Sequence, residues 1–162
     1  KMASRFPLLS PPARGGARGG GRGGVRGGMI FFNHPPPSAL PRLLPLLQKT
    51  KEAYLLWYEF YQTIPKIHRH SLGQKIDILF VEIIEAIAGA AFLARQEKLP
   101  FVRLAIKKVD TLKIFLMILW ETKSLDNKKY IALSLKVDEI GKMLGGWNGQ
   151  LVKQNSPKPG EK

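Results

Sequence analysis

The stretch "SLGQKIDILFVEIIEAIAGAAFLA", residues 71–94, decides the fold class. Its apolar side chains recur at intervals of three and four residues, which is the spacing of one buried face on a helix. This stripe consists of Leu72, Ile76, Leu79, Phe80, Ile83, Ile87, Ala90 and Ala94. Ser71, directly before the stripe, is a residue type that caps helix N-termini. The stretch therefore predicts a long amphipathic helix, and no period-two strand pattern competes with it.

A first helix is predicted on the N-terminal side of this stretch, from Leu43 to the turn at Pro65. Proline ends a helix because it lacks the backbone N–H and its ring clashes with the preceding turn. The apolar stripe of this helix is Leu47, Tyr54, Trp57, Phe60 or Tyr61, and Ile64.

Two more helices are predicted on the C-terminal side. The residues "EKLP" at 97–100 predict a break, with Pro100 in the first turn of a third helix that stops near Lys123. In "SLDNKK", Asp126 is the candidate N-cap of a fourth helix that runs to Leu151. The two stripes are Phe101, Leu104, Ala105, Val109, Leu112, Leu116 and Leu119, and Tyr130, Leu133, Val137, Ile140, Leu144, Trp147 and Leu151. The prediction is an all-α, antiparallel up-down-up-down four-helix bundle over residues 41–152.

Glycines interrupt the fourth helix within "DEIGKMLGGWNGQL", residues 138–151. Each costs about 1 kcal/mol relative to alanine inside a helix. Gly141, Gly145 and Gly149 are spaced by four, so they form a stripe that would let another helix of the bundle or of a neighbouring subunit approach closely. The alternative is a helix that ends near Leu144. Because Trp147 falls on the apolar stripe, we expect the helix to continue through Gly145 and Gly146.

The second and third helices have apolar side chains off their main stripes. A lone four-helix bundle buries one stripe per helix, so these residues would be exposed in a monomer. They are Ile78, Val81, Ile84, Phe92, Ile106, Ile114, Phe115 and Ile118. This excess predicts a homo-oligomer.

The composition favours a polyanionic partner. The 162 residues have a formal net charge of +14, and residues 41–152 alone have 17 basic and 11 acidic side chains. Such a balance favours nucleic acid as the partner. The absence of cysteine excludes a disulfide scaffold and a cysteine nucleophile, and it fits a reducing, cytoplasmic location. The longest apolar run, residues 86–94, is too short to span a membrane.

Both ends of the chain differ from the helical region. Residues 1–40 contain "PPARGGARGGGRGGVRGG" followed by a Pro-rich segment, so we expect them to be disordered. Their arginines predict an RNA-binding tail: Arg14, Arg18, Arg22 and Arg26. The alternative is a segment foreign to the domain, with Met29 as a plausible natural start. Residues 153–162 form a polar C-terminal tail.

Two basic sets are candidate phosphate contacts. The first lies in "PKIHRHSLGQK" and consists of Lys66, His68, Arg69, His70 and Lys75. It precedes a predicted helix start, where exposed N–H groups also favour a phosphate; a solvated turn is the alternative. The second set is Arg103, Lys107 and Lys108, which could track a phosphate backbone or simply form a solvated helix face.

No catalytic or metal site is predicted. Glu82 and Glu85 are neighbours on the second helix, but the chain has no Glu-x-x-His motif, which a di-iron bundle needs. His68 and His70 lack further ligands, so a metal pair is a weak interpretation. There is no P-loop, Rossmann or zinc spacing. We expect no enzyme activity, no cofactor and no small-molecule substrate.

Three segments resemble a known family: "LLWYEFYQTIPKIHRHSLGQKID" at 55–77, "KLPF" at 98–101 and "VDEIGKMLGGW" at 137–147. They resemble the accessory variability determinant (Avd) proteins of diversity-generating retroelements. These belong with a wider group of four-helix bundles that includes proteins encoded by intervening sequences in 23S ribosomal RNA genes. The resemblance covers about Leu46 to Leu151.

The resemblance implies a non-enzymatic, barrel-like homopentamer that binds nucleic acid and the retroelement's reverse transcriptase. Such a protein supports the copying of template RNA into mutagenised cDNA. By position, the family's basic surface maps onto Lys66, Arg69, Lys75, Arg103, Lys107 and Lys108. The alternative within the wider group is a structural oligomerisation or ribosomal-RNA-binding module.

Overall fold

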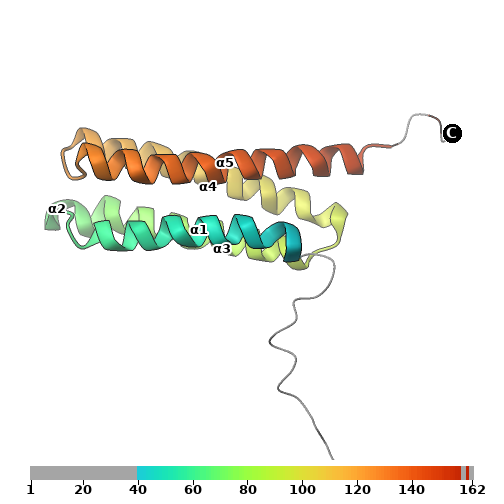
Figure 1. Ribbon diagram of the computed structural model, residues 1–162, viewed down its shortest axis with the longest axis horizontal. Helices are drawn as coiled ribbons and strands as arrows, with labels where there is room; N and C mark the ends of the chain where they lie inside the picture. The colour runs from blue at the N-terminus through green and yellow to red at the C-terminus, as the bar shows by residue number, and fades with distance from the viewer. Residues whose placement is uncertain (1–39, 158–159, 161–162) are drawn as a thin grey trace, which may run out of the picture. The chain divides into compact units, whose positions relative to one another are not determined.

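Four long helices form the part of the chain that a computed structural model describes, residues 40–157 and residue 160, with side chains from Pro45 onward. They are α1 (Leu40–Tyr61), α3 (Gln74–Phe92), α4 (Arg95–Glu121) and α5 (Asn127–Asn155) (Figure 1). A short α2 (Lys66–His68) and a π-helical turn, η1 (Arg69–Gly73), lead directly into α3. The Arg/Gly-rich tail and its four candidate arginines lie outside the described residues.

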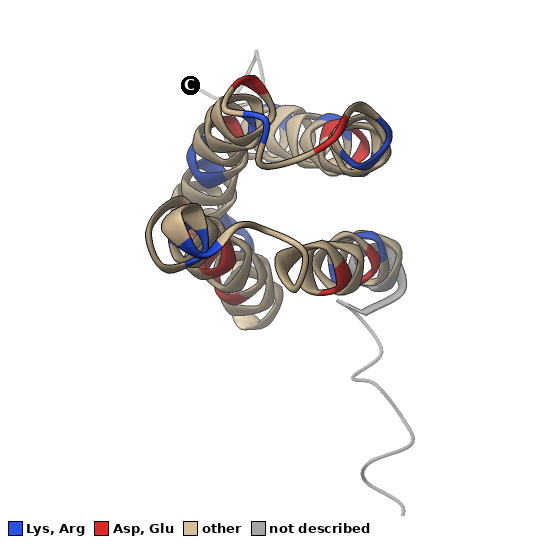
Figure 2. Cartoon of the chain, turned by 90° about the vertical axis from the view of Figure 1, so that its left-hand side faces the viewer, with Lys and Arg blue, Asp and Glu red and all other residues tan. Residues whose placement is uncertain are grey.

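The helices pack as an antiparallel bundle, in which α1 contacts α3 and α5, and α4 contacts the same two helices. Figure 2 shows the four helices end-on, at the corners of the bundle. Between α1 and α5, Lys49 pairs with Glu139 at 3.1 Å and Glu52 pairs with Lys136 at 3.7 Å. The residue numbers rise along one helix as they fall along the other, so these helices are antiparallel. The predicted four-helix bundle is confirmed.

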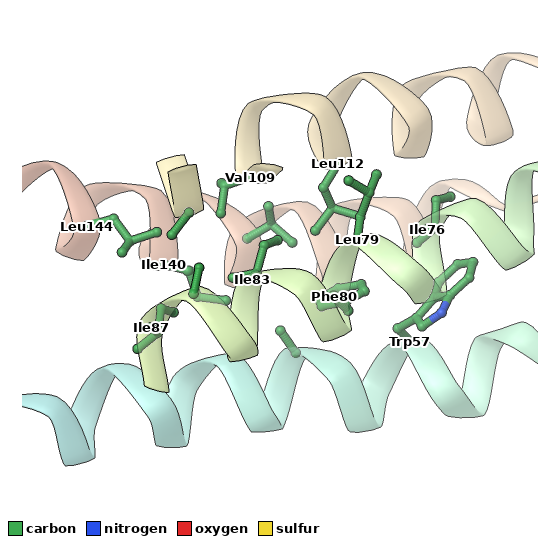
Figure 3. Close-up of a cluster of buried hydrophobic side chains, with 14 of the residues drawn as sticks. Trp57, Ile76, Leu79, Phe80, Ile83, Ile87, Val109, Leu112, Ile140 and Leu144 are labelled. Atoms are coloured by element: carbon green, nitrogen blue, oxygen red, sulfur yellow. The ribbon is translucent and has the colours of Figure 1, made fainter. Parts of the chain in front are cut away.

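The predicted stripes form the core. Trp57 of α1 stacks on Phe80 of α3 with ring centroids 6.4 Å apart. Each large apolar side chain that is fully buried contributes about 1.5–3 kcal/mol. Figure 3 draws 14 buried hydrophobic residues. The ten that are labelled, none more than 2% exposed, are Trp57, Ile76, Leu79, Phe80, Ile83, Ile87, Val109, Leu112, Ile140 and Leu144.

Polar contacts also hold α1 in place. Burial raises the pKa of the Tyr54 hydroxyl, and the charge of Asp77 on α3 adds to this effect. A hydrogen bond from Gln48 lowers the pKa of Glu52, and the charge of Lys136 on α5 lowers it further. Thus α1 makes polar contacts with both of its neighbours.

One predicted cap is confirmed and one is wrong. The Asp126 carboxylate accepts a hydrogen bond from the backbone N–H of Lys129 at 2.9 Å, as an N-cap does. Ser71 caps nothing, because helical backbone already extends from Lys66 through η1 into α3. Its hydroxyl instead donates to the carbonyl of Ile67, one turn earlier, at 3.2 Å.

The predicted break at 97–100 is also wrong. α3 ends at Phe92 and α4 begins at Arg95, so Pro100 is the sixth residue of α4 rather than part of its first turn. Proline is tolerated there because only the carbonyl of Gln96, close to the helix start, loses its partner. Ala94, in the turn between the two helices, is exposed, and Phe101 and Leu104 are 39% and 44% exposed instead of buried.

The fourth helix continues past its glycines, as predicted. α5 extends through Gly145 and Gly146 to Asn155, beyond the predicted end at Leu151. Leu151 is buried, and Trp147 is half-buried against the core. The alternative, a helix that ends near Leu144, is excluded.

Candidate nucleic-acid interface

The π-helical turn η1 is fixed against α1 by close packing. A Cβ atom on Gly73 would lie 3.0 Å from a ring carbon of Tyr61 and 3.3 Å from the carbonyl oxygen of His68. Any larger residue would therefore push the turn away from α1. The Tyr61 hydroxyl also donates to the carbonyl of Arg69 at 3.3 Å. The close packing of the widened turn thus favours glycine at this position.

Arg69 holds the loop between α1 and α2. Its Nε and Nη2 donate to the carbonyl of Ile64 at 3.1 and 2.9 Å, and Nη2 also donates to the carbonyl of Gln62 at 2.9 Å. A guanidinium has five N–H groups, so only those of Nη1 remain for another partner. The structure therefore gives this predicted phosphate contact a role within its own loop.

The loop after α1 touches the turn between α4 and α5. His68 Nδ1 lies 2.5 Å from the hydroxyl oxygen of Ser124. Lys129 Nζ donates to the Thr63 hydroxyl at 2.9 Å and lies 5.6 Å from the ring centroid of Phe60. Two turns that are far apart in sequence are thereby joined at one end of the bundle.

Both turns at this end of the bundle, which faces the viewer in Figure 2, contain basic residues. We define the turn-end surface as Lys66, His68, His70, Lys123, Lys128 and Lys129. Lys66, Lys123 and Lys128 are exposed, and no carboxylate of the described residues lies within 4 Å of their ammonium groups. The nearest acidic residues in sequence are Glu121 and Asp126. Uncompensated lysines on adjacent turns are suited to binding phosphate.

The second basic set lies elsewhere on the bundle. Lys108 on α4 pairs with Glu82 on α3 at 2.8 Å, while Arg103 and Lys107 are exposed. Because α3 and α4 are antiparallel, Arg103 lies beyond this pair, toward the α3–α4 turn and away from the turn-end surface. Lys75 is exposed near the start of α3. The structure therefore does not bring the two predicted basic sets together in one protomer.

The glycine stripe of α5 has two different surroundings. A Cβ on Gly141 would lie 3.4 Å from Nζ of Lys113 and 3.6 Å from a methyl group of Val109, both on α4. Gly145 and Gly149 are exposed, and a Cβ added to either would meet no neighbouring atom of the described residues within 4 Å. The prediction that a helix of the same bundle approaches Gly145 and Gly149 closely is therefore wrong. Close approach by a helix of a neighbouring subunit stays a prediction.

The expected excess of apolar surface is partly present. Ile78, Val81, Phe92 and Ile114 are exposed, the last at 53%. The other predicted residues, Ile84, Ile106, Phe115 and Ile118, are half-buried. Further exposed apolar side chains come from positions that the sequence did not single out: Leu55, Tyr58, Ile67, Met117, Trp120, Ile131, Leu135 and Val152.

Lys123 and Trp120 are the site residues that the sequence interpretation missed. Both lie in "WETKSLDNKK", residues 120–129, where an aromatic residue precedes a run of lysines. Aromatic and basic residues close together are typical of nucleic-acid binding, so this spacing was a usable signal.

The carboxylates considered for catalysis have ordinary surroundings. Glu82 forms its ion pair with Lys108, and Glu85 is exposed. Among the residues that the structure describes, no three His, Cys, Asp or Glu side chains are grouped so that they could hold a metal ion. No described helix is long and apolar enough to cross a membrane.

The fold and the turn-end surface define a small, basic, helical-bundle protein. Residues 44–151, more than half of the chain, match the model of the family described as bAvd-like. The chain belongs to this family, and its resemblance to Avd proteins is confirmed. No curated protein matches the sequence.

Proposed function

We propose that this protein is a non-enzymatic accessory protein that binds nucleic acid and a retroelement reverse transcriptase, and so supports the copying of template RNA into cDNA. Membership in the bAvd-like family supports the accessory role. The turn-end surface is the observation that supports nucleic-acid binding: it combines lysines of two turns that His68 and Ser124 hold together.

The lysines of this surface bind phosphate by charge. Ion pairs already occupy Lys49, Lys108, Lys113 and Lys136 elsewhere on the bundle. Lys66, Lys123 and Lys128 have no such partner among the described residues, so a phosphate need not displace a carboxylate from them. Each phosphate contact releases a counterion, which makes the affinity depend on salt.

A salt titration tests this proposal. The affinity of the full chain for a single-stranded RNA should fall steeply as salt rises. In the triple variant Lys66→Gln, Lys123→Gln, Lys128→Gln, the slope of log K against log salt should become less steep by about 2. The matched control removes the same charge from exposed lysines elsewhere: Lys51→Gln, Lys142→Gln, Lys153→Gln. Affinity that is flat with salt, or equal losses in the two triple variants, would refute the turn-end surface as the binding site.

Binding to the reverse transcriptase needs its own test. A reverse transcriptase encoded near this gene should co-purify with the tagged full chain after nuclease treatment. The treatment matters because a shared RNA could otherwise join two proteins that do not touch. Failure to co-purify would remove the reverse transcriptase from the proposal and leave a nucleic-acid-binding protein.

The exposed apolar surface favours a second candidate, a structural oligomerisation module of the ribosomal-intervening-sequence type. Ile114 and Leu135 are 53% and 66% exposed, on different helices. A subunit interface would bury such side chains, and the family resemblance implies a pentamer. Mass photometry or sedimentation gives the stoichiometry. An oligomer that binds no RNA at low salt would favour this candidate over the first.

A further inference from the structure

An aromatic pair borders the turn-end surface. Trp120 in the last turn of α4 stacks on Tyr130 in the first turns of α5, with ring centroids 5.1 Å apart and planes inclined by 15°. The indole N–H donates to the side-chain oxygen of Asn127. These two contacts fix the ring. Trp120 is nevertheless 38% exposed, although Tyr130 covers one face of its ring.

An open hollow of about 630 Å³ lies beside the exposed indole. Its lining residues come from the end of α4, the start of α5 and the turn between them: Trp120, Glu121, Lys123, Leu125, Asp126 and Asn127. The hollow therefore combines an aromatic residue, an apolar residue and polar groups. A flat heterocycle with hydrogen-bonding edges has complementary chemistry.

Lys123 adopts a backbone conformation that glycine normally occupies. Its φ is 61°, and it follows the C-terminus of α4. The N–H of Ser124 bonds to the carbonyl of Leu119 and the N–H of Lys123 bonds to that of Trp120, both at 3.0 Å, which is the Schellman pattern. Glycine suits this left-handed position best, so a lysine here is strained. Such strain is typical of sites where the side chain has a function.

We propose that Trp120 stacks on an unpaired base of a single-stranded nucleic acid, which enters this hollow while Lys123 and Lys128 contact the flanking phosphates. The inference rests on the proposed nucleic-acid binding and specifies its substrate as unpaired strand. In a duplex both faces of each base are covered by its neighbours, so only an unpaired base can stack on a protein side chain.

The acidic residues in the hollow are consistent with a base rather than a phosphate as the occupant. Asp126 is already engaged, since its carboxylate accepts from the N–H of Lys129 and lies 3.8 Å from the Lys129 ammonium. Glu121 is exposed at the rim. A carboxylate repels phosphate, but it accepts hydrogen bonds from the amino groups on base edges. The phosphates are thus directed to the ammonium groups of Lys123, which lines the hollow, and of Lys128.

Three labelled probes test the proposal with the full chain: an oligothymidylate, a blunt DNA duplex of the same length, and an oligonucleotide in which abasic sites replace the bases. Trp120→Ala should weaken binding of the oligothymidylate by about 5- to 150-fold and leave the duplex and the abasic strand unchanged. Trp120→Phe keeps an aromatic face and should restore most of the affinity. Circular dichroism melting checks that both variants fold.

A second variant separates function from folding at Lys123. Lys123→Gly removes the strain, so it should raise the melting temperature while weakening binding of all three probes, because it removes a phosphate contact. Gln154→Ala is the control, because Gln154 is exposed near the C-terminal end of α5, away from the hollow, and this variant should change neither affinity nor probe preference.

The outcomes separate this inference from the proposed function. If Trp120→Ala leaves oligothymidylate binding unchanged, or weakens all three probes equally, stacking on Trp120 is wrong while salt-dependent binding still supports the proposed function. If the unaltered protein binds none of the probes at low salt, both are wrong. Lower stability of Lys123→Gly would contradict the strain argument and the role it gives this lysine.

Discussion

Gly73 is the residue at which the bundle depends most on the lack of a side chain. Gly73→Ala would place a methyl group 3.0 Å from the Tyr61 ring, which is tighter than nearly all real Cβ contacts, so the ring must shift by a few tenths of an ångström. Because Tyr61 also packs edge-to-face against buried Trp57, with ring centroids 5.7 Å apart, this shift disturbs the core. We expect a loss of about 1–3 kcal/mol in the free energy of unfolding, measured by urea denaturation.

The same substitution at Gly146 serves as the matched control. Gly146 lies in the interior of α5, and no neighbouring atom would meet its new methyl group within 4 Å. Alanine has the better helix propensity, so Gly146→Ala should gain about 0.5–1 kcal/mol. Equal effects of the two variants would show that η1 does not need the close approach to α1.

Arg69 differs from the lysines around it because its guanidinium donates hydrogen bonds to backbone carbonyls of the same chain. Arg69→Ala leaves the carbonyls of Ile64 and Gln62 without these partners, so unfolding should become easier by about 1.5–3 kcal/mol. Arg69→Lys should recover little, since an ammonium cannot reproduce the planar fork.

The comparison residue for this prediction is Lys66, which is exposed and has no carboxylate partner among the described residues. Lys66→Ala should change the free energy of unfolding by less than about 0.5 kcal/mol and weaken RNA binding. If Arg69→Ala instead left stability unchanged and weakened RNA binding more than Lys66→Ala does, Arg69 would be a phosphate contact.

At the scale of the element, periodicity predicted which helices exist but not where each begins. The stripe of α3 is visible in sequence because its core residues recur with the helical period. The start of α4 at Arg95 is not visible, since a proline fits the first turn or lies slightly beyond it at similar cost. The π-helical turn was missed because its stability depends on Tyr61, which belongs to another helix.

The site was predictable only in part, for the same physical reason. Composition and local charge identified Lys66 and its neighbours. The contact between His68 and Ser124 joins residues 56 positions apart, and no local pattern encodes such a pairing. Likewise, the exposure of Trp120 follows from its helix register in the bundle and not from its residue type.

The C-terminal half of α5 provides a prediction about assembly. Within one protomer no neighbouring atom lies within 4 Å of a Cβ built on Gly145, so the bundle itself has room for a larger side chain. Gly145→Leu should therefore leave the monomer folded but disrupt a helix contact between subunits. We expect a lower mass in sedimentation, with helix content preserved in circular dichroism. Unchanged mass would show that the glycine stripe is not a subunit interface.

At the scale of the whole molecule, the candidate nucleic-acid contacts form three groups. They are the Arg/Gly-rich segment, the turn-end surface, and the exposed pair Arg103 and Lys107 on α4. The measured salt slope counts phosphate contacts, so it reports how many of these places one strand reaches.

The contribution of the Arg/Gly-rich segment can be measured in the full chain without truncation. Replacing Arg14, Arg18, Arg22 and Arg26 with glutamine should lower the salt slope for single-stranded RNA by about 3 if all four contact phosphate. Combined with the turn-end variant, the two reductions should add, because each set of substitutions removes its own phosphate contacts. The preference for unpaired strand should survive the arginine changes, since it depends on Trp120. An unchanged salt slope in the arginine variant would mean that the bundle alone binds the strand. Loss of the preference for unpaired strand would mean that the arginines, and not the bundle, recognise the bases.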